Sequence, residues 1–171
     1  ETGLFTDPRF VAVDGRPFGP LPREWAHYKG LYYHGQQVIV KYTVGEADVL
    51  ESYSLVNSES TPIIKRTLNV QAAEMNLKMR IAPLSNAVKW KGEGVQLEKE
   101  DGFHVLIIQA NSKANVNLFM AAKESAFSNR VVLESPEDLN QYTHGGPAHY
   151  VNQVLTTPIQ VGAENGAYGH T

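Results

Sequence analysis

Apolar and polar positions alternate along much of the chain with a period of two, the spacing that a β-strand requires. In residues 38–44 the even positions are apolar or aromatic, whereas the odd positions include Lys41 and Thr43. The alternation is stricter in residues 74–81, which predicts a strand with one solvent-facing side. Residues 103–110 form the most apolar run and are expected to lie in the centre of a sheet. Further strands are expected at residues 48–55, 63–70, 88–90, 95–98 and 116–122.

These short segments, separated by turn signals about every 8–12 residues, predict an all-β protein. We expect an antiparallel β-sandwich with a Pro/Gly-rich N-terminal arm and at most short helices. Residues 1–35 are rich in proline and glycine and are expected to form an irregular arm packed on the domain, with one helical turn at residues 23–29. The sandwich is expected to span residues 36–160. A short helix is expected to begin at Pro136, with Ser135 as its N-cap.

Residues 161–171 are small and polar and contain three glycines. They are expected to form a linker, or a truncated strand, that leads into a neighbouring domain. On this interpretation the chain is a piece of a longer protein, although a mature chain that ends in a flexible tail stays open as the alternative.

Composition excludes several classes of site and function. The chain has 171 residues and no cysteine, which excludes a disulfide framework, a zinc–thiolate site, a thiol nucleophile and covalent attachment of haem c within it. The formal net charge of −3 argues against a general nucleic-acid-binding surface. No apolar run approaches the roughly 20 residues that a membrane span needs. Length suits one domain.

Catalytic motifs are not evident. The sequence contains neither Gly-x-Ser-x-Gly nor Gly-x-Gly-x-x-Gly, and Gly92-x-Gly94 is expected to form a hairpin turn. His104, inside an apolar strand, is predicted to be half-buried and hydrogen-bonded. His144 and His149 lie five residues apart around Gly-Gly-Pro, which favours a structural turn, with a ligand contact or a metal as alternatives. No catalytic residue and no metal ligand is assigned.

Aromatic residues are the strongest candidates for a binding surface. Amphipathic rings at the edge of a sandwich can seal the core, contact a neighbouring domain or stack on sugars. We expect the first of these roles and keep the other two open. The candidate residues, which include the two histidines of the Gly-Gly-Pro turn, are Trp25, Tyr28, Tyr32, Tyr33, His144, His149 and Tyr150.

Two parts of the sequence resemble a known family. Residues 5–9, 17–25, 29–35 and 38–44, together with residues 138–147, resemble an uncharacterised domain of large secreted proteins from planctomycetes and verrucomicrobia. In those proteins the domain is followed by a β-propeller that resembles sugar dehydrogenases, and a c-type haem domain commonly lies further on. The resemblance transfers no catalytic residue, since the family has no assigned site.

The resemblance implies a periplasmic or extracellular location, a multidomain parent and a polysaccharide or electron-transfer context. Haem c would belong only to the larger parent, and no cofactor is expected in this chain. The first hypothesis is a non-catalytic accessory domain whose partners are its neighbouring domains. The alternatives are a carbohydrate-binding module that uses the arm aromatics and, less favoured, a glycan hydrolase. No nucleic acid and no membrane span is expected.

Overall fold

The computed structural model describes residues 10–19, 22–56, 61–127 and 132–144. It confirms the predicted fold class, since the described chain is an antiparallel all-β sandwich with only two short 3₁₀ helices. The strands are β1 Phe10–Val11, β2 Pro17–Phe18, β3 Ala26–His34, β4 Gln37–Val44, β5 Ala47–Val56, β6 Ile63–Val70, β7 Leu77–Pro83, β8 Ala87–Glu93, β9 Val95–Glu100, β10 Phe103–Ile108 and β11 Ala114–Ala121. The 3₁₀ helices are η1 Glu124–Ala126 and η2 Leu139–Tyr142.

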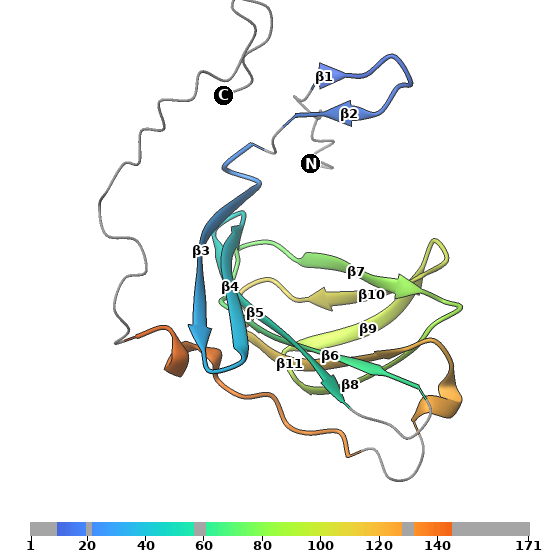
Figure 1. Ribbon diagram of the computed structural model, residues 1–171. Coiled ribbons are helices and arrows are strands. Elements are labelled where there is room, and N and C mark those ends of the chain that lie inside the picture. The colour runs from blue at the N-terminus through green and yellow to red at the C-terminus, as the bar shows by residue number, and fades with distance from the viewer. Residues whose placement is uncertain (1–9, 20–21, 57–60, 128–131, 145–171) are drawn as a thin grey trace, which may run out of the picture.

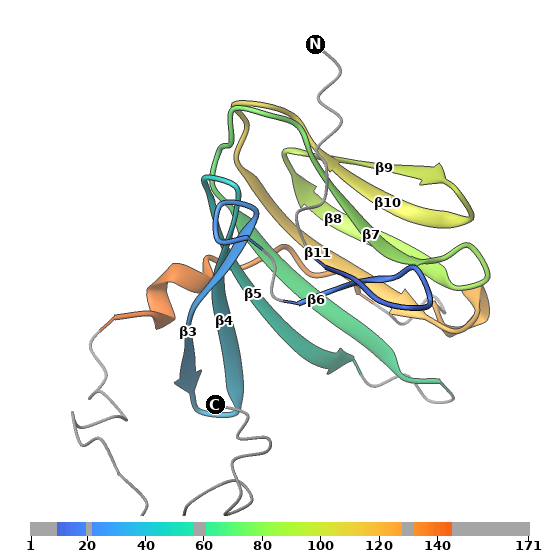
Figure 2. The ribbon, with the colours of Figure 1, turned by 90° about the horizontal axis from the view of Figure 1, so that it is seen from above.

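Two sheets of unequal size form the sandwich. The larger has six strands in the order β3-β4-β5-β6-β11-β8, and the smaller has three in the order β7-β10-β9. β10, the most apolar strand, lies in the centre of the smaller sheet, as its composition predicted. Figures 1 and 2 show the smaller sheet stacked over only part of the larger one, with β3 and β4 extending beyond it. Part of the larger sheet therefore has no covering layer among the described residues.

The main core lies between the two sheets and is made by the alternate residues of each strand that point inward. The larger sheet contributes buried residues such as Val49, Leu68 and Val116, and the smaller contributes Leu106 and Ile108. Leu106 and Ile108 lie on β10, and each is paired with a residue of β7 on one side and a residue of β9 on the other. These paired residues therefore point toward the same core. Burying such side chains supplies roughly 1.5–3 kcal/mol each.

The chain crosses from the larger sheet to the smaller one at Gly92-Glu93-Gly94. β8 pairs with β11 and β9 pairs with β10, so these two consecutive strands lie in different sheets and do not form the predicted hairpin. Gly94 has φ +75°, and a Cβ there would lie 1.9 Å from the carbonyl oxygen of Lys113. Glycine is required because the corner brings β8 and β9 against the backbone of β11.

A segment of residues 132–142, which ends in η2, crosses the outer face of the larger sheet. Leu139 is fully buried there against Ile39 and Leu50. The helix predicted at Pro136 is instead η2, and Asp138 rather than Ser135 caps it by accepting a hydrogen bond from the Asn140 amide at 2.9 Å. The carboxylate of an aspartate at this position reaches the second amide beyond it, a geometry typical of N-caps.

The N-terminal region departs from the expected irregular arm. Residues 26–34, within the predicted helical turn and arm, form β3, the nine-residue edge strand of the larger sheet. β1 and β2 form a separate two-stranded pair. The sheet therefore begins ten residues before the expected boundary at residue 36. The proposed divisions at residues 160 and 161 lie outside the described residues.

Candidate functional site

The inner face of the larger sheet continues well beyond the smaller sheet. On β6, Leu68 and Val70 point into the main core, so Arg66 and Ile64 lie on the same face two and four residues earlier. Cross-strand pairing extends this face to both edges of the sheet. Directly opposed residues in antiparallel strands share a face. The pairs that carry it are Tyr28–Tyr42, Leu31–Val40, Tyr33–Val38, Tyr53–Arg66, Leu55–Ile64, Arg66–Leu118 and Leu118–Trp90.

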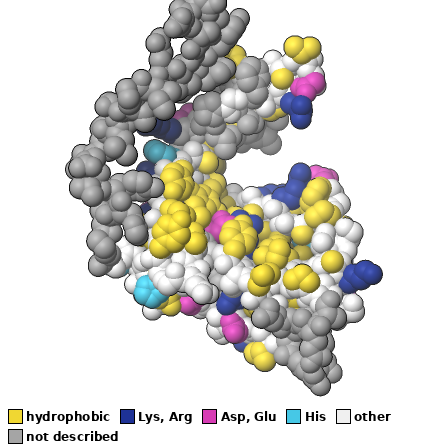
Figure 3. Space-filling model, in the orientation of Figure 1, with side chains coloured by type: hydrophobic (Ala, Val, Ile, Leu, Met, Phe, Trp, Pro, Cys, Tyr) yellow, Lys and Arg dark blue, Asp and Glu magenta, His cyan; other side chains and the backbone are white. Residues whose placement is uncertain are grey.

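Large apolar side chains are exposed where the smaller sheet does not reach. We call this surface the open face, and it consists of Tyr28, Leu31, Tyr33, Val38, Tyr53, Leu55, Ile64 and Trp90. Tyr28 and Tyr33 are each 62% exposed and Leu55 is 66% exposed. Figure 3 shows hydrophobic side chains gathered over β3, β4 and β5.

The open face is large for the surface of a single domain. Its eight side chains average about half exposure. At roughly 200 Å² for each ring, the four aromatic residues alone present on the order of 400 Å², and four partly exposed aliphatic side chains add to this area. The largest apolar patch on a typical monomer is roughly 300–600 Å². A standard protein–protein interface buries roughly 800 Å² per partner. The open face has the dimensions of one half of such an interface.

A buried ion pair lies between the main core and the open face. The Glu51 carboxylate accepts a hydrogen bond from the Tyr42 hydroxyl at 2.5 Å, and its other oxygen lies 2.7 Å from Nε of Arg66. The Arg66 guanidinium lies over the Tyr53 ring, 5.5 Å from its centroid. The side chain of Glu51 is 7% exposed and that of Arg66 is 14% exposed. We call these four residues the Glu51 cluster.

Burial and mutual contacts shift the pKa values of the whole cluster. Burial alone would raise the pKa of Glu51, but hydrogen bonds from Arg66, Tyr42 and Tyr53 outweigh it and the net shift is downward. Burial, followed by the hydrogen bond to Glu51, raises the pKa of Tyr53 to about 12, and the pKa of Tyr42 rises for the same reasons. The pKa of Arg66 is raised, since its pairing with Glu51 exceeds the opposing effect of burial. The cluster thus holds a carboxylate, a guanidinium and two neutral phenols.

These shifts predict a stability that falls at both ends of the pH range. The pKa of Tyr53 in the folded state exceeds the ordinary 10.0, so its contribution is complete below pH 10 and is lost as the pH rises toward about 12. The pKa of Glu51 is lowered from 4.5, so its contribution is present above pH 4.5 and is lost as the pH falls. Urea unfolding across pH, with phenolate absorbance of the native protein, measures both effects. Tyr53→Phe removes one late phenolate step, whereas the control Tyr28→Phe leaves it; a late step that survives Tyr53→Phe contradicts the assignment.

The arm aromatics do not form one cluster. Tyr28 and Tyr33 lie on the open face, whereas Tyr32 points to the opposite face and packs against the core of Ile39, Leu50 and Leu139. Trp25 precedes β3 and is half-buried, with its carbonyl accepting a hydrogen bond from Gly45. The sealing role expected for these rings therefore applies to Tyr32 alone among the three tyrosines.

The histidine candidates are separated as well. His144 is exposed just after η2, and His149 and Tyr150 lie outside the described residues. His104 is half-buried and its Nε2 lies 3.0 Å from the carbonyl oxygen of Asn86, as predicted. Within the described ranges, no group of three or more His, Cys, Asp or Glu residues could hold a metal ion. No helix in this part of the chain is long and apolar enough to cross a membrane.

Sequence reasoning missed the residues that complete the open face on β5, β6 and β8, including Tyr53, Leu55, Ile64 and Trp90. A signal existed, since Glu51, Tyr53 and Leu55 continue the alternation of Val49 on β5. Period two assigns these residues to the inner face but does not reveal which part of that face a second sheet covers.

The fold and site define a small all-β sandwich with an apolar face that no other element among the described residues covers. Residues 1–51 match the family model described as a domain of unknown function (DUF6797), a segment that ends within β5. No curated protein and no solved structure matches the chain. The family match supports that part of the resemblance which concerns an uncharacterised domain.

Proposed function

We propose that this chain is a non-catalytic accessory domain that docks through its open face onto a neighbouring domain of a larger exported protein. The observation that carries the proposal is the open face itself, an apolar surface of interface size on one side of a sheet. Docking would complete the sandwich by covering the part of the larger sheet that the smaller sheet leaves exposed.

The composition of the open face favours a protein partner. Aliphatic Leu31, Leu55 and Ile64 lie among the rings, and branched aliphatic side chains pack well against another apolar protein surface. A sugar platform depends on stacking against aromatic faces, and the separation of Tyr32 from Tyr28 and Tyr33 divides the arm aromatics between two faces. The partner is therefore a folded domain with a complementary apolar surface.

The context proposed for this domain follows from the family resemblance. The parent would be a periplasmic or extracellular multidomain protein with a polysaccharide or electron-transfer role. A haem c in that parent would be held by another domain, because the present chain has no cysteine to bind the haem covalently.

A titration with the adjoining domain of the natural polypeptide, expressed separately, tests the proposal. We expect the wild-type chain to bind it and Leu55→Asp to weaken binding at least ten-fold, because a carboxylate would be buried in an apolar contact. Leu84→Asp is the matched control, since Leu84 is 42% exposed and lies outside the open face. Calorimetry gives the dissociation constants.

Three results would overturn docking through the open face. The natural polypeptide could contain no further domain, the adjoining domain could fail to bind the wild-type chain, or Leu55→Asp could bind as tightly as Leu84→Asp. Circular dichroism of each variant before titration separates lost binding from lost folding.

A further inference from the structure

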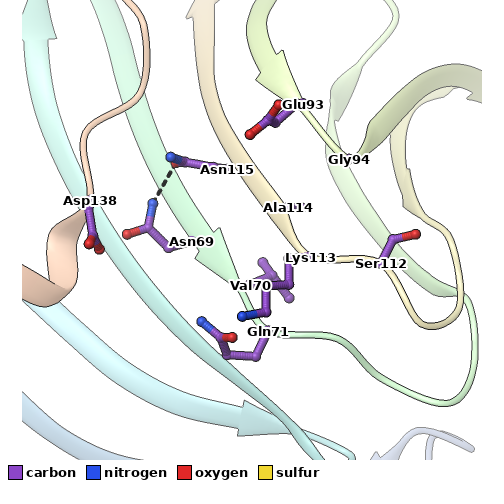
Figure 4. A pocket seen from close by; sticks show the side chains of 10 residues that line it. All are labelled: Asn69, Val70, Gln71, Glu93, Gly94, Ser112, Lys113, Ala114, Asn115 and Asp138. Carbon is purple, nitrogen blue, oxygen red and sulfur yellow. Dashed lines mark hydrogen bonds between the residues drawn. The ribbon is translucent and has the colours of Figure 1, made fainter.

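The outer face of the larger sheet carries a polar groove beside the segment of residues 132–142. Three adjoining cavities of about 480, 280 and 350 Å³ share lining residues. The first two share Asn69, Gln71 and Asp138, and the first and third share Glu93 and Asn115. Figure 4 shows the central part, with Asp138 on the side of the crossing segment and Glu93 at the end of β8. We call this surface the amide groove.

The amide groove follows one row of the sheet. Register pairs Lys41 with Leu50, Leu50 with Asn69, Asn69 with Asn115 and Asn115 with Glu93. This row crosses the five strands from β4 to β8. At roughly 4.8 Å between strands, it extends about 19 Å. Leu139 of the crossing segment covers Leu50 in this row, so the groove runs along the side of that segment. Its three cavities together are long enough for an extended chain molecule rather than a single small ring.

The lining of the groove is polar and balanced in charge. Its charged residues are the lysines Lys41, Lys91 and Lys113 and the acids Asp48, Glu93 and Asp138. Three positive and three negative groups give no net attraction for a polyanion or a polycation. No hydrogen bond or ion pair joins the side chains of Gln71, Glu93 and Lys113 to one another or to another described residue. These donors and acceptors are available to a ligand.

The amides of the groove are held in place by the fold. Asn69 Nδ2 donates to Asn115 Oδ1 at 2.7 Å, and Asn69 Oδ1 accepts from the Leu139 amide at 2.6 Å. The dashed line in Figure 4 marks the first of these bonds. The bond fixes the Asn115 amide through its oxygen, so the NH₂ group of Asn115 stays available as a donor. Fixed polar groups bind at a smaller entropic cost than mobile ones.

We propose that the amide groove binds a neutral linear oligosaccharide. Each sugar hydroxyl both donates and accepts, which matches a lining of amides, carboxylates and ammonium groups without net charge. The length of the row matches a chain of several sugar rings. The site lies on the opposite face of the sheet from the docking surface, so both can be occupied together.

Calorimetric titration of the full chain with neutral hexasaccharides tests the proposal. The probes are cellohexaose, xylohexaose, mannohexaose and laminarihexaose, with a polygalacturonate hexamer as the charged comparison and a neutral extended hexapeptide as the peptide comparison. We expect one neutral hexasaccharide to bind and the double variant Glu93→Ala/Lys113→Ala to weaken that binding at least ten-fold. Both side chains are exposed and the double change leaves net charge unaltered.

The matched control is Glu98→Ala/Lys99→Ala on β9, an exposed pair of the same chemistry outside the groove. This control should leave the dissociation constant unchanged. Tyr33→Ala should also leave it unchanged, which distinguishes the groove from the open face. The proposal is overturned if no neutral hexasaccharide binds, if only the charged hexamer or the peptide binds, or if the groove variant and the control variant bind equally well.

Discussion

Gly94→Ala is expected to lower the free energy of unfolding by about 3 kcal/mol, because two costs add at this position. The backbone of Gly94 has φ +75°, a conformation that L side chains rarely adopt. A Cβ would also lie 1.9 Å from the carbonyl oxygen of Lys113 and 2.9 Å from Cα of Ala114. Both contacts are with backbone at the start of β11, Lys113 and Ala114, so relief requires the corner between β8 and β9 to move away from that backbone. Urea unfolding of the wild type and the variant measures the loss.

A second glycine separates the two costs. Gly102 has a similar φ of +81°, but a Cβ there would meet no atom within 4 Å. Gly102→Ala should therefore cost only about 1 kcal/mol, from the backbone conformation alone. Equal losses at the two positions would show that the close approach of the sheets at the corner contributes nothing. If Gly94→Ala does not fold, Gly92→Ala, with its predicted Cβ contact at 2.1 Å to Asn115 O, should fail in the same way.

The sandwich could be predicted because most strands keep an unbroken alternation. β4, β5, β6, β10 and β11 each fall within about two residues of the expected segment. β7 begins at Leu77 rather than at residue 74, and the Asn76 side chain there accepts a hydrogen bond from the Ala110 amide. Alternation records which side of each strand faces the core, and this information is local.

β3 escaped prediction because a bulge interrupts its alternation. Its pairing with β4 shifts between Tyr28 and Gly30, so one extra residue enters the strand there. Tyr28 faces inward from an even position, whereas Leu31 and Tyr33 face inward from odd positions. Because the inward-facing positions change from even to odd within nine residues, the sequence shows no continuous strand pattern there. The nearby prolines of the arm also favoured the prediction of irregular structure.

The open face and the amide groove depend on sheet order, which alternation does not encode. Arg66 meets Tyr53 on one side and Leu118 on the other because β6 lies between β5 and β11. Asn69 and Asn115 meet for the same reason, although they are 46 residues apart. The aromatic signal in the sequence therefore identified two residues of the open face but could not assemble the surface around them.

Arg66→Met is expected to lower the free energy of unfolding by about 3 kcal/mol. The change leaves Glu51 as an unpaired carboxylate whose side chain is only 7% exposed, beside a core of apolar residues. The hydroxyl of Tyr42 still donates to Glu51 but supplies no charge. Arg66→Lys keeps the charge and should therefore lose less than Arg66→Met. Some loss remains, because a lysine cannot reproduce the planar contact of the guanidinium with the Tyr53 ring.

The double variant Glu51→Leu/Arg66→Met decides whether the pair stabilises the fold or is tolerated by it. Apolar residues of similar size remove both charges, so the double variant should be more stable than Arg66→Met alone. Its loss of stability should be smaller than the sum of the losses in the two single variants. The control is Lys78→Met, which breaks the exposed Lys78–Glu100 pair of 2.7 Å and should leave stability unchanged. A double variant that loses as much as the two single variants combined would mean that Glu51 and Arg66 act independently. A recovered double variant would instead show that the Glu51–Arg66 pair adds no net stability to the fold, as is common for buried ion pairs.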